Sequence, residues 1–101
     1  MKLITDPRVQ EFIDDLEKDD KGRVLHHVDL FIQYGFALPA KYLKKLESNL
    51  WELRPGTIRL FLGCIIDTEQ WTIVHGFKKK TQKTPEKELK TARLRIKEYQ
   101  L

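Results

Sequence analysis

The sequence predicts an α+β domain, because apolar residues repeat with a helical period at both ends of the chain and with a strand period in the middle. Near the start, spacings of three and four residues indicate an amphipathic helix with the apolar positions Val9, Phe12, Ile13 and Leu16. From residue 58 to residue 66, every second residue is apolar, as in a strand. The length of 101 residues suits one modest core, so we expect residues 1–101 to form a single domain.

Two helices are expected before the sheet. Asp6 is a suitable N-cap, and Pro7 suits the first helical position. Gly22 interrupts the helical pattern, which restarts at Val24 and ends at Gly35, a residue type typical of helix C-termini. The short connection predicts an N-terminal helical hairpin with antiparallel helices.

The middle of the chain predicts an antiparallel sheet. Residues 42–46 have the apolar spacing of a short helical turn. Strands then follow at residues 50–54, 57–66 and 71–77. The first two are joined by Pro55-Gly56, where glycine can take a positive φ, and the last two by a polar loop at residues 67–70. We expect three to four strands, the fourth being residues 1–4 at an edge.

A C-terminal helix completes the predicted domain. Thr84 is a suitable N-cap, and Pro85 suits the first helical position. An apolar stripe at helical spacing follows, formed by Leu89, Ala92, Ile96 and Tyr99. We assign this stripe to core packing.

Charge is unevenly distributed along the chain. Residues 1–20 have a net charge of −4, whereas residues 78–101 have +6, against +4 for the whole protein. Four lysines fall at positions 78–83, between the last strand and the C-terminal helix. Such a run is often a solvated surface loop. Because ordered elements hold it at both ends, we favour a site for a polyanion such as a phosphate backbone.

Several classes of protein are not indicated. Cys64 is alone and lies in an apolar pattern, so neither a disulfide framework nor a cysteine metal site is expected. His26 and His27 are adjacent rather than spaced as helical ligands, and we expect no metal and no cofactor. No signal peptide or membrane span is visible, which predicts a cytoplasmic protein without membrane contact.

The strands carry side chains suited to phosphate chemistry. Arg54 and Arg59 flank the Pro55-Gly56 turn, and His75 lies near the end of the last strand, before Lys78. Guanidinium groups bind phosphate, and an imidazole exchanges protons near neutral pH. We predict these four as catalytic residues for cleavage of RNA by its own 2′-hydroxyl. The remaining lysines, Lys79, Lys80 and Lys83, are predicted to bind RNA. From pattern alone, a surface role for the arginines and a packing role for His75 stay open.

Three segments of the chain resemble the RelE-type toxin superfamily, and in particular its phage-derived HigB-like branch. They are Leu50-Trp51-Glu52-Leu53-Arg54, then Arg59-Leu60-Phe61, and the run from Val74 to Pro85 that contains His75-Gly76-Phe77 and the lysines. The third segment is the most specific, and the similarity covers about residues 43–99.

This resemblance implies a compact RelE-like fold and a toxin of a type II toxin–antitoxin module. Such toxins cleave mRNA, typically in the ribosomal A site, without a metal. The resemblance implies that Arg59 and Lys78 to Lys80 hold the scissile phosphate, with Arg54 as a second basic position. Glu52 departs from relatives that carry a basic residue there. Tyr99 lies too far along the last helix to match the C-terminal tyrosine of some relatives.

The resemblance also implies partners. We expect a cognate antitoxin with a helix-turn-helix, mRNA on the ribosome, and contact with operator DNA only through the antitoxin. The charge distribution leaves two binding routes open for the antitoxin. Acidic groups of the antitoxin could cover the lysines and arginines, or the antitoxin could bind the acidic residues 6–20, away from the site, which is the route we favour. Two other functions stay open: a non-catalytic module that binds RNA or protein on a degenerate toxin fold, and a small nucleic-acid-binding regulator unrelated to toxins.

Overall fold

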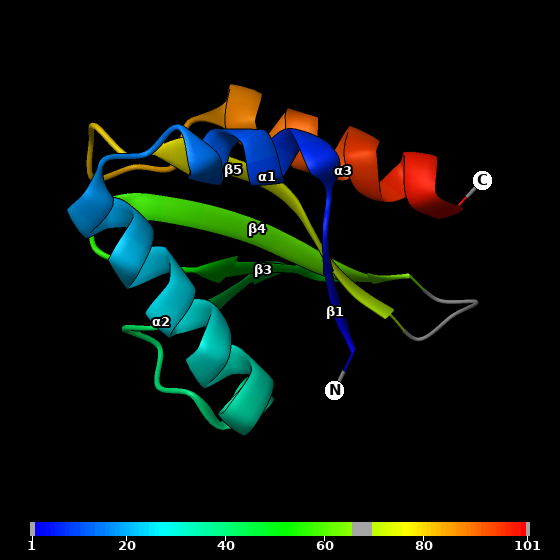
Figure 1. Ribbon diagram of the computed structural model, residues 1–101. Helices are drawn as coiled ribbons and strands as arrows, with labels where there is room; N and C mark the ends of the chain where they lie inside the picture. Colours follow the sequence, from blue (N-terminus) through cyan, green and yellow to red (C-terminus); the bar gives the residue numbers. More distant parts are fainter. Residues whose placement is uncertain (1, 66–69, 101) are drawn as a thin grey trace.

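The computed structural model describes residues 2–65 and 70–100. It contains a five-stranded sheet with helices on both faces (Figure 1). In chain order the elements are β1 (Leu3–Thr5), α1 (Pro7–Asp14), α2 (Lys18–Tyr34), the 3-10 turn η1 (Gly35–Ala37), β2 (Leu43–Glu47), β3 (Leu50–Leu53), β4 (Ile58–Ile65), β5 (Gln70–Lys78) and α3 (Glu86–Gln100). This arrangement confirms the predicted α+β class.

The strand order is β1-β5-β4-β3-β2, and all neighbours are antiparallel except β1, which runs parallel to β5. The three predicted strands are β3, β4 and β5, and the expected edge strand is β1. Residues 67–69 of the predicted polar loop lie outside the described residues, whereas Gln70, the last residue of that predicted loop, belongs to β5.

The fifth strand corrects one expectation. Leu43–Glu47 forms β2, not a helical turn, and pairs with β3. The spacing of Leu43 and Leu46 suggested one helix face. In a strand, an odd spacing instead sends the two side chains to opposite faces of the sheet. Leu43 packs in the core beneath α1 and α2, whereas Leu46 packs against the core beneath α3. Because helices cover both faces of the sheet, both leucines are apolar, and their spacing resembles that of one helix face.

The two N-terminal helices form an open V rather than a close antiparallel hairpin (Figure 1). Helix α1 begins as predicted, with the Asp6 carboxylate accepting from the Arg8 N–H at 2.7 Å and Pro7 in the first turn. The break falls at residues 15–17, before α2 starts at Lys18. Gly22 lies inside α2, where a Cβ would meet nothing within 4 Å. Because α2 continues through Gly22, the prediction of a helix break at this residue is wrong.

An irregularity between β4 and β5 decides toward which face of the sheet the side chains at the end of β5 point. Phe61 pairs with His75, but Leu62 pairs with Ile73, so Val74 is an extra residue in β5. Such a bulge reverses the alternation of side chains that follow it. Ile73 therefore packs in the core beneath α1 and α2, whereas Phe77 packs beneath α3. The bulge turns His75 to the same face as Phe77.

The C-terminal helix packs as predicted, but its start differs by one residue. Ala92 and Ile96 are buried, and Leu89 and Tyr99 pack beside them. The Pro85 carbonyl accepts from the N–H groups of Glu88 and Leu89, so Pro85 takes the N-cap position expected for Thr84. Within the described residues, no helix is both long and apolar enough to cross a membrane.

Candidate phosphate-binding site

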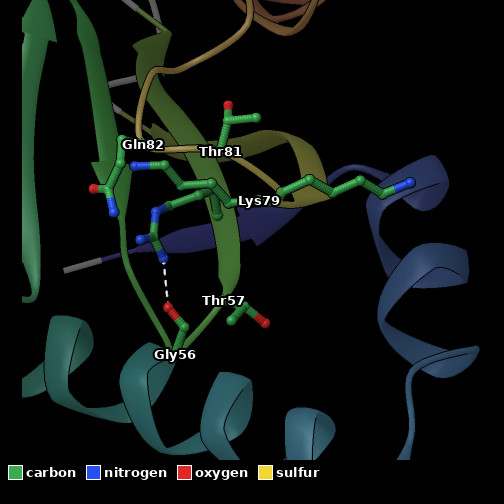
Figure 2. A pocket seen from close by; sticks show the side chains of 7 residues that line it. Gly56, Thr57, Lys79, Thr81 and Gln82 are labelled. Atoms are coloured by element: carbon green, nitrogen blue, oxygen red, sulfur yellow. Dashed lines mark hydrogen bonds between the residues drawn. The ribbon is translucent and has the colours of Figure 1, made fainter.

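A cationic cavity of about 360 Å³ lies where the β3–β4 turn meets the segment after β5 (Figure 2). Its walls come from two stretches of chain, residues 56–59 and 79–82, that are distant in the sequence. The lining residues are Gly56, Thr57, Arg59, Lys79, Lys80, Thr81 and Gln82. Three of these side chains carry a positive charge, so the cavity is suited to an anion.

Backbone geometry holds the two walls together. The Lys79 N–H donates to the Thr57 carbonyl at 2.7 Å and so extends the β4–β5 pairing to the edge of the cavity. The turn itself closes with the Ile58 N–H donating to the Pro55 carbonyl at 2.9 Å. Gly56 has φ +60°, a conformation that glycine adopts without strain. The predicted positive φ at this turn is confirmed.

Arg59 is held rigidly at the base of β4. Its Nη1 donates to the Gly56 carbonyl at 2.6 Å and to the Ile58 carbonyl at 2.8 Å. Its side chain is 11% exposed, and its Nε finds no hydrogen-bond partner among the described residues. Burial lowers the pKa of Arg59, and the nearby Glu52 carboxylate opposes that change. The guanidinium is therefore preorganised but not fully paired.

Glu52 connects the two predicted catalytic arginines. It lies on β3 with its side chain 2% exposed, and its Oε1 is 3.2 Å from Arg54 Nε and 3.9 Å from Arg59 Nε. Its other oxygen is 3.5 Å from the Thr84 hydroxyl. The sequence marked this acid only as a departure from relatives. In the sequence, Glu52 lies two residues before Arg54. This spacing puts the two side chains on one face of a strand, so it could have indicated their contact.

Positive charge exceeds negative charge around this carboxylate. The pKa of Lys79 is lowered, first by burial and then by the positive charge of Arg59, with Arg54 and Lys44 adding to the effect. Glu52 opposes this shift but does not cancel it. A bound phosphate would relieve the repulsion among these cations.

A second cavity, of about 470 Å³, adjoins the first. Gly56 and Arg59 line both cavities, so the two meet at the β3–β4 turn. The full lining of the second cavity is His27, Lys41, Tyr42, Arg54, Gly56 and Arg59. Arg54 is anchored there by its Nη1, which donates to the Ala40 carbonyl at 3.3 Å. Sequence reasoning had not placed His27 or Tyr42 near the arginines.

His75 lies under α3 and lines neither of these two cavities. Its Nδ1 is 3.4 Å from Arg95 Nη1, and its Nε2 is 3.3 Å from Glu88 Oε1. Because a guanidinium only donates, Nδ1 accepts, and Nε2–H donates to Glu88. Burial lowers the pKa of His75, and Glu88 only partly offsets this, which favours the neutral ring. The predicted catalytic role of His75 stays a prediction.

The other predicted lysines differ in their surroundings. Lys79 and Lys80 line the first cavity. Lys78 points elsewhere: its side chain is 57% exposed, and its Nζ lies 3.7 Å from Asp20 Oδ2 on α2. Lys83 is exposed, and its carbonyl accepts from the Thr81 hydroxyl. The structure thus brings together Arg54, Arg59, Lys79 and Lys80.

The contact between Lys78 and Asp20 corrects a further expectation. The acidic segment 6–20 does not lie wholly away from the lysines, because its C-terminal end pairs with the first of them. Asp6, at the N-terminal end of this acidic segment, stabilises the fold. Asp6 is buried and accepts from Arg8 Nη2 at 2.8 Å and from the Tyr99 hydroxyl at 2.7 Å. Tyr99 therefore joins α3 to the start of α1, rather than facing either cavity.

Metal ligands are not clustered in the part of the chain that the structure describes. Within residues 2–65 and 70–100, no group of three or more histidine, cysteine, aspartate or glutamate side chains is placed to hold a metal ion.

Comparisons with known proteins agree with this architecture. The family model described as "Phage derived protein Gp49-like (DUF891)" matches residues 11–97. Among solved structures, a chain of the archaeal RelE–RelB complex from Pyrococcus horikoshii OT3 matches with a TM-score of 0.65 at 20% sequence identity. The match covers 81% of this chain and 97% of that chain. No curated protein matches the sequence. At this identity the structural match shows a shared RelE-like fold.

Proposed function

The chain belongs to the phage-derived Gp49-like family and has a RelE-like fold, and from this premise we propose that it is the toxin of a type II toxin–antitoxin module. Its activity would be cleavage of mRNA on the ribosome. The observation that carries the proposal is the preorganised Arg59 guanidinium, which faces a cavity together with Lys79 and Lys80.

The chemistry requires little more than positioning and charge. The 2′-hydroxyl loses a proton and attacks the adjacent phosphorus, so a 2′-O–P bond forms as the P–O5′ bond breaks. The products are a 2′,3′-cyclic phosphate and a 5′-hydroxyl that gains a proton. Arg59 and Lys79 would stabilise the negative charge that builds on the phosphorane. Arg54, which lines the second cavity, is proposed to assist at the phosphate. His75 and Lys78 line neither cavity, so their proposed roles, proton transfer for His75 and phosphate contact for Lys78, would require the RNA to extend beyond the cavities or the side chains to move.

An antitoxin partner belongs to the same proposal. The archaeal RelE-like structure was solved as a RelE–RelB complex. For this chain we propose a cognate antitoxin with a helix-turn-helix, which would also be its route to operator DNA. A cationic site left uncovered in the cell would bind RNA, so inhibition requires a tight complex.

Induction in cells, without the neighbouring gene, tests the proposal. We expect growth arrest and new mRNA 5′ ends that carry hydroxyl groups, mapped by sequencing. An Arg59→Ala variant with a native circular dichroism spectrum should produce neither. Growth arrest without new mRNA ends would rule out the nuclease.

One observation favours a second candidate, a non-catalytic module that binds RNA or protein. Arg59 already donates to two backbone carbonyls and lies near Glu52, so part of its hydrogen-bonding capacity is used within the protein. Binding of RNA or ribosomes by purified protein, without any cleavage, would support this candidate.

A further inference from the structure

The second cavity places an aromatic pair beside the arginine pair. His27 and Tyr42 line it with ring centroids 5.4 Å apart and ring planes at 58°. Because Gly56 and Arg59 line both cavities, one extended ligand can occupy both. The first cavity has cationic and polar walls without an aromatic ring among its described lining residues. The two cavities therefore offer different chemistry on either side of Arg59.

The Tyr42 ring is available to a ligand. The backbone of Tyr42 is already secured, since its N–H donates to the Pro39 carbonyl and its carbonyl accepts from the Arg54 N–H at 2.8 Å. The ring is half-buried, and the exposed Lys41 places its Nζ 5.0 Å from the ring centre. This cation–π contact is weak at an exposed site. A planar group could replace the ammonium on the ring, and Lys41 could then meet a phosphate.

Cations that alternate with aromatic rings are the common means of binding single-stranded nucleic acid. We propose that Tyr42, supported by His27, stacks on the nucleobase next to the phosphate held at Arg59, so that the second cavity is a base-binding subsite. This inference rests on the proposed function, because it takes RNA at Arg59 as given. Stacking does not read the edges of a base. The subsite therefore positions the RNA strand rather than selecting a codon.

A fluorescent RNA tests the subsite. The probe is a 2′-O-methyl RNA, which has no attacking hydroxyl, with 2-aminopurine beside the central phosphate. It is used free and as the A-site codon of a message on ribosomes. Stacking on Tyr42 should quench the 2-aminopurine, both in the wild type and in Tyr42→Phe. Tyr42→Ala should lose the quenching and bind about 5- to 150-fold more weakly. Tyr42→Leu keeps apolar bulk and should also lose the quenching.

Two controls isolate the ring from other effects. Tyr34→Ala removes an exposed aromatic from the same helix as His27, outside both cavities, and should behave like the wild type. A probe that is abasic beside the central phosphate should bind equally to the wild type and to Tyr42→Ala, because no base remains to stack.

The outcomes separate this inference from the proposed function. If Tyr42→Ala quenches and binds like the wild type while Arg59→Ala does not bind, the base subsite is wrong and the proposed function stands. If Tyr42→Phe behaves like Tyr42→Ala, the hydroxyl matters and stacking is overturned. If the wild type binds RNA in neither setting, or Arg59→Ala binds as tightly as the wild type, both ideas fail.

Discussion

Glu52 and its two arginines explain why a cationic site can exist in a stable fold. Burying guanidinium groups without a counter-charge is costly, and Glu52 offsets part of that cost for both Arg54 and Arg59. The backbone carbonyls of Gly56 and Ile58 hold Arg59 further in place. The site is therefore partly neutralised within the protein and still has a surplus of positive charge for a ligand.

Arg59→Ala should abolish growth arrest and leave the fold intact. Losing one preorganised donor to a developing charge typically costs about 2.7–4 kcal/mol, or about 10²–10³ in rate. The measurement is growth after induction, with circular dichroism as the check on folding. Growth arrest by Arg59→Ala at the wild-type level would show that Arg59 does not hold the reacting phosphate.

Glu52→Gln should separate binding from reaction. Removal of the negative charge strengthens the attraction for RNA, so affinity at low salt should hold or rise. The arginines lose the group that orients them, so growth arrest should weaken, and stability should fall by about 1–3 kcal/mol.

RNA binding and urea unfolding of the purified variant check these effects. Glu47→Gln is the matched control, because Glu47 pairs with Arg93 at 2.7 Å, outside both cavities. If RNA affinity drops together with growth arrest, Glu52 supports binding rather than orientation.

The segment after β5 shows how a bulge and a loop place charges. The extra residue Val74 reverses the strand alternation, so Phe77 anchors the end of β5 beneath α3. The Lys79 N–H then pairs with Thr57 and fixes the direction in which the lysines leave the sheet. Lys79 and Lys80 reach the cavity, whereas Lys78 reaches Asp20.

Replacing Lys79 and Lys80 with Gln should flatten the salt dependence of RNA or ribosome binding. Each phosphate contact that is lost should change the slope of log K against log salt concentration by about 0.7. The measurement is affinity over a range of salt concentrations. The control replaces Lys90 and Lys97 of α3, which line neither cavity, and changes the net charge by the same amount. Equal slopes for the two double variants would mean that the lysines at the cavity do not meet phosphate.

The junction of α1 and α3 depends on one ionised carboxylate. The Arg8 guanidinium and the Tyr99 hydroxyl hold the pKa of Asp6 well below its ordinary value of 3.8. Burial, together with the hydrogen bond to Asp6, raises the pKa of Tyr99 to about 12. Because the folded pKa of Asp6 is lowered, the carboxylate stabilises the fold above pH 3.8, and this contribution is lost as the pH falls through the folded pKa.

Asp6→Asn should therefore lower stability at neutral pH by about 1–3 kcal/mol, with a smaller deficit in acid. Urea unfolding at several pH values measures the effect, and Tyr99→Phe, which keeps the carboxylate, is the comparison. A deficit that does not change with pH would exclude Asp6 ionisation as the cause.

Acidic and basic surfaces meet at the corner where α1, α2 and the end of β5 approach one another. Asp14, Asp15 and Glu17 are exposed there, and Asp20 pairs with Lys78. A partner bound to these acids would also lie close to the cavity edge. Under the proposed function, an antitoxin bound at this acidic corner would block access to the ribosomal A site.

Neutralising Asp14, Asp15 and Glu17 should weaken antitoxin binding without ending growth arrest. Surface charges of this kind contribute about 0.2–1 kcal/mol each and act mainly on the association rate. Surface plasmon resonance with purified antitoxin measures both the affinity and the association rate. The comparison neutralises Lys78, Lys79 and Lys80. If only the lysine variant loses affinity, the antitoxin covers the cationic site instead.

Local patterns were enough to predict the class of fold and the order of most elements. Asp6-Pro7 predicted the start of α1, alternation predicted β4, and the helical stripe of α3 became its buried face. These features depend on neighbouring residues and on one period, so a sequence displays them directly. The chemistry of the site was also visible, since Arg54, Arg59 and the lysines are recognisable by type.

What the sequence determined by itself was therefore the set of elements and the cationic character of the site. Only the tertiary structure decided which groups meet. Leu43 and Leu46 mimicked a helix because the sheet is covered on both faces, and the bulge at Val74 turned His75 toward α3. Glu52 lies between Arg54 and Arg59, and Tyr42 lines the second cavity, because the fold brings the strands and turns that carry these residues together. Such contacts depend on register, bulges and helix placement, which local periodicity does not encode.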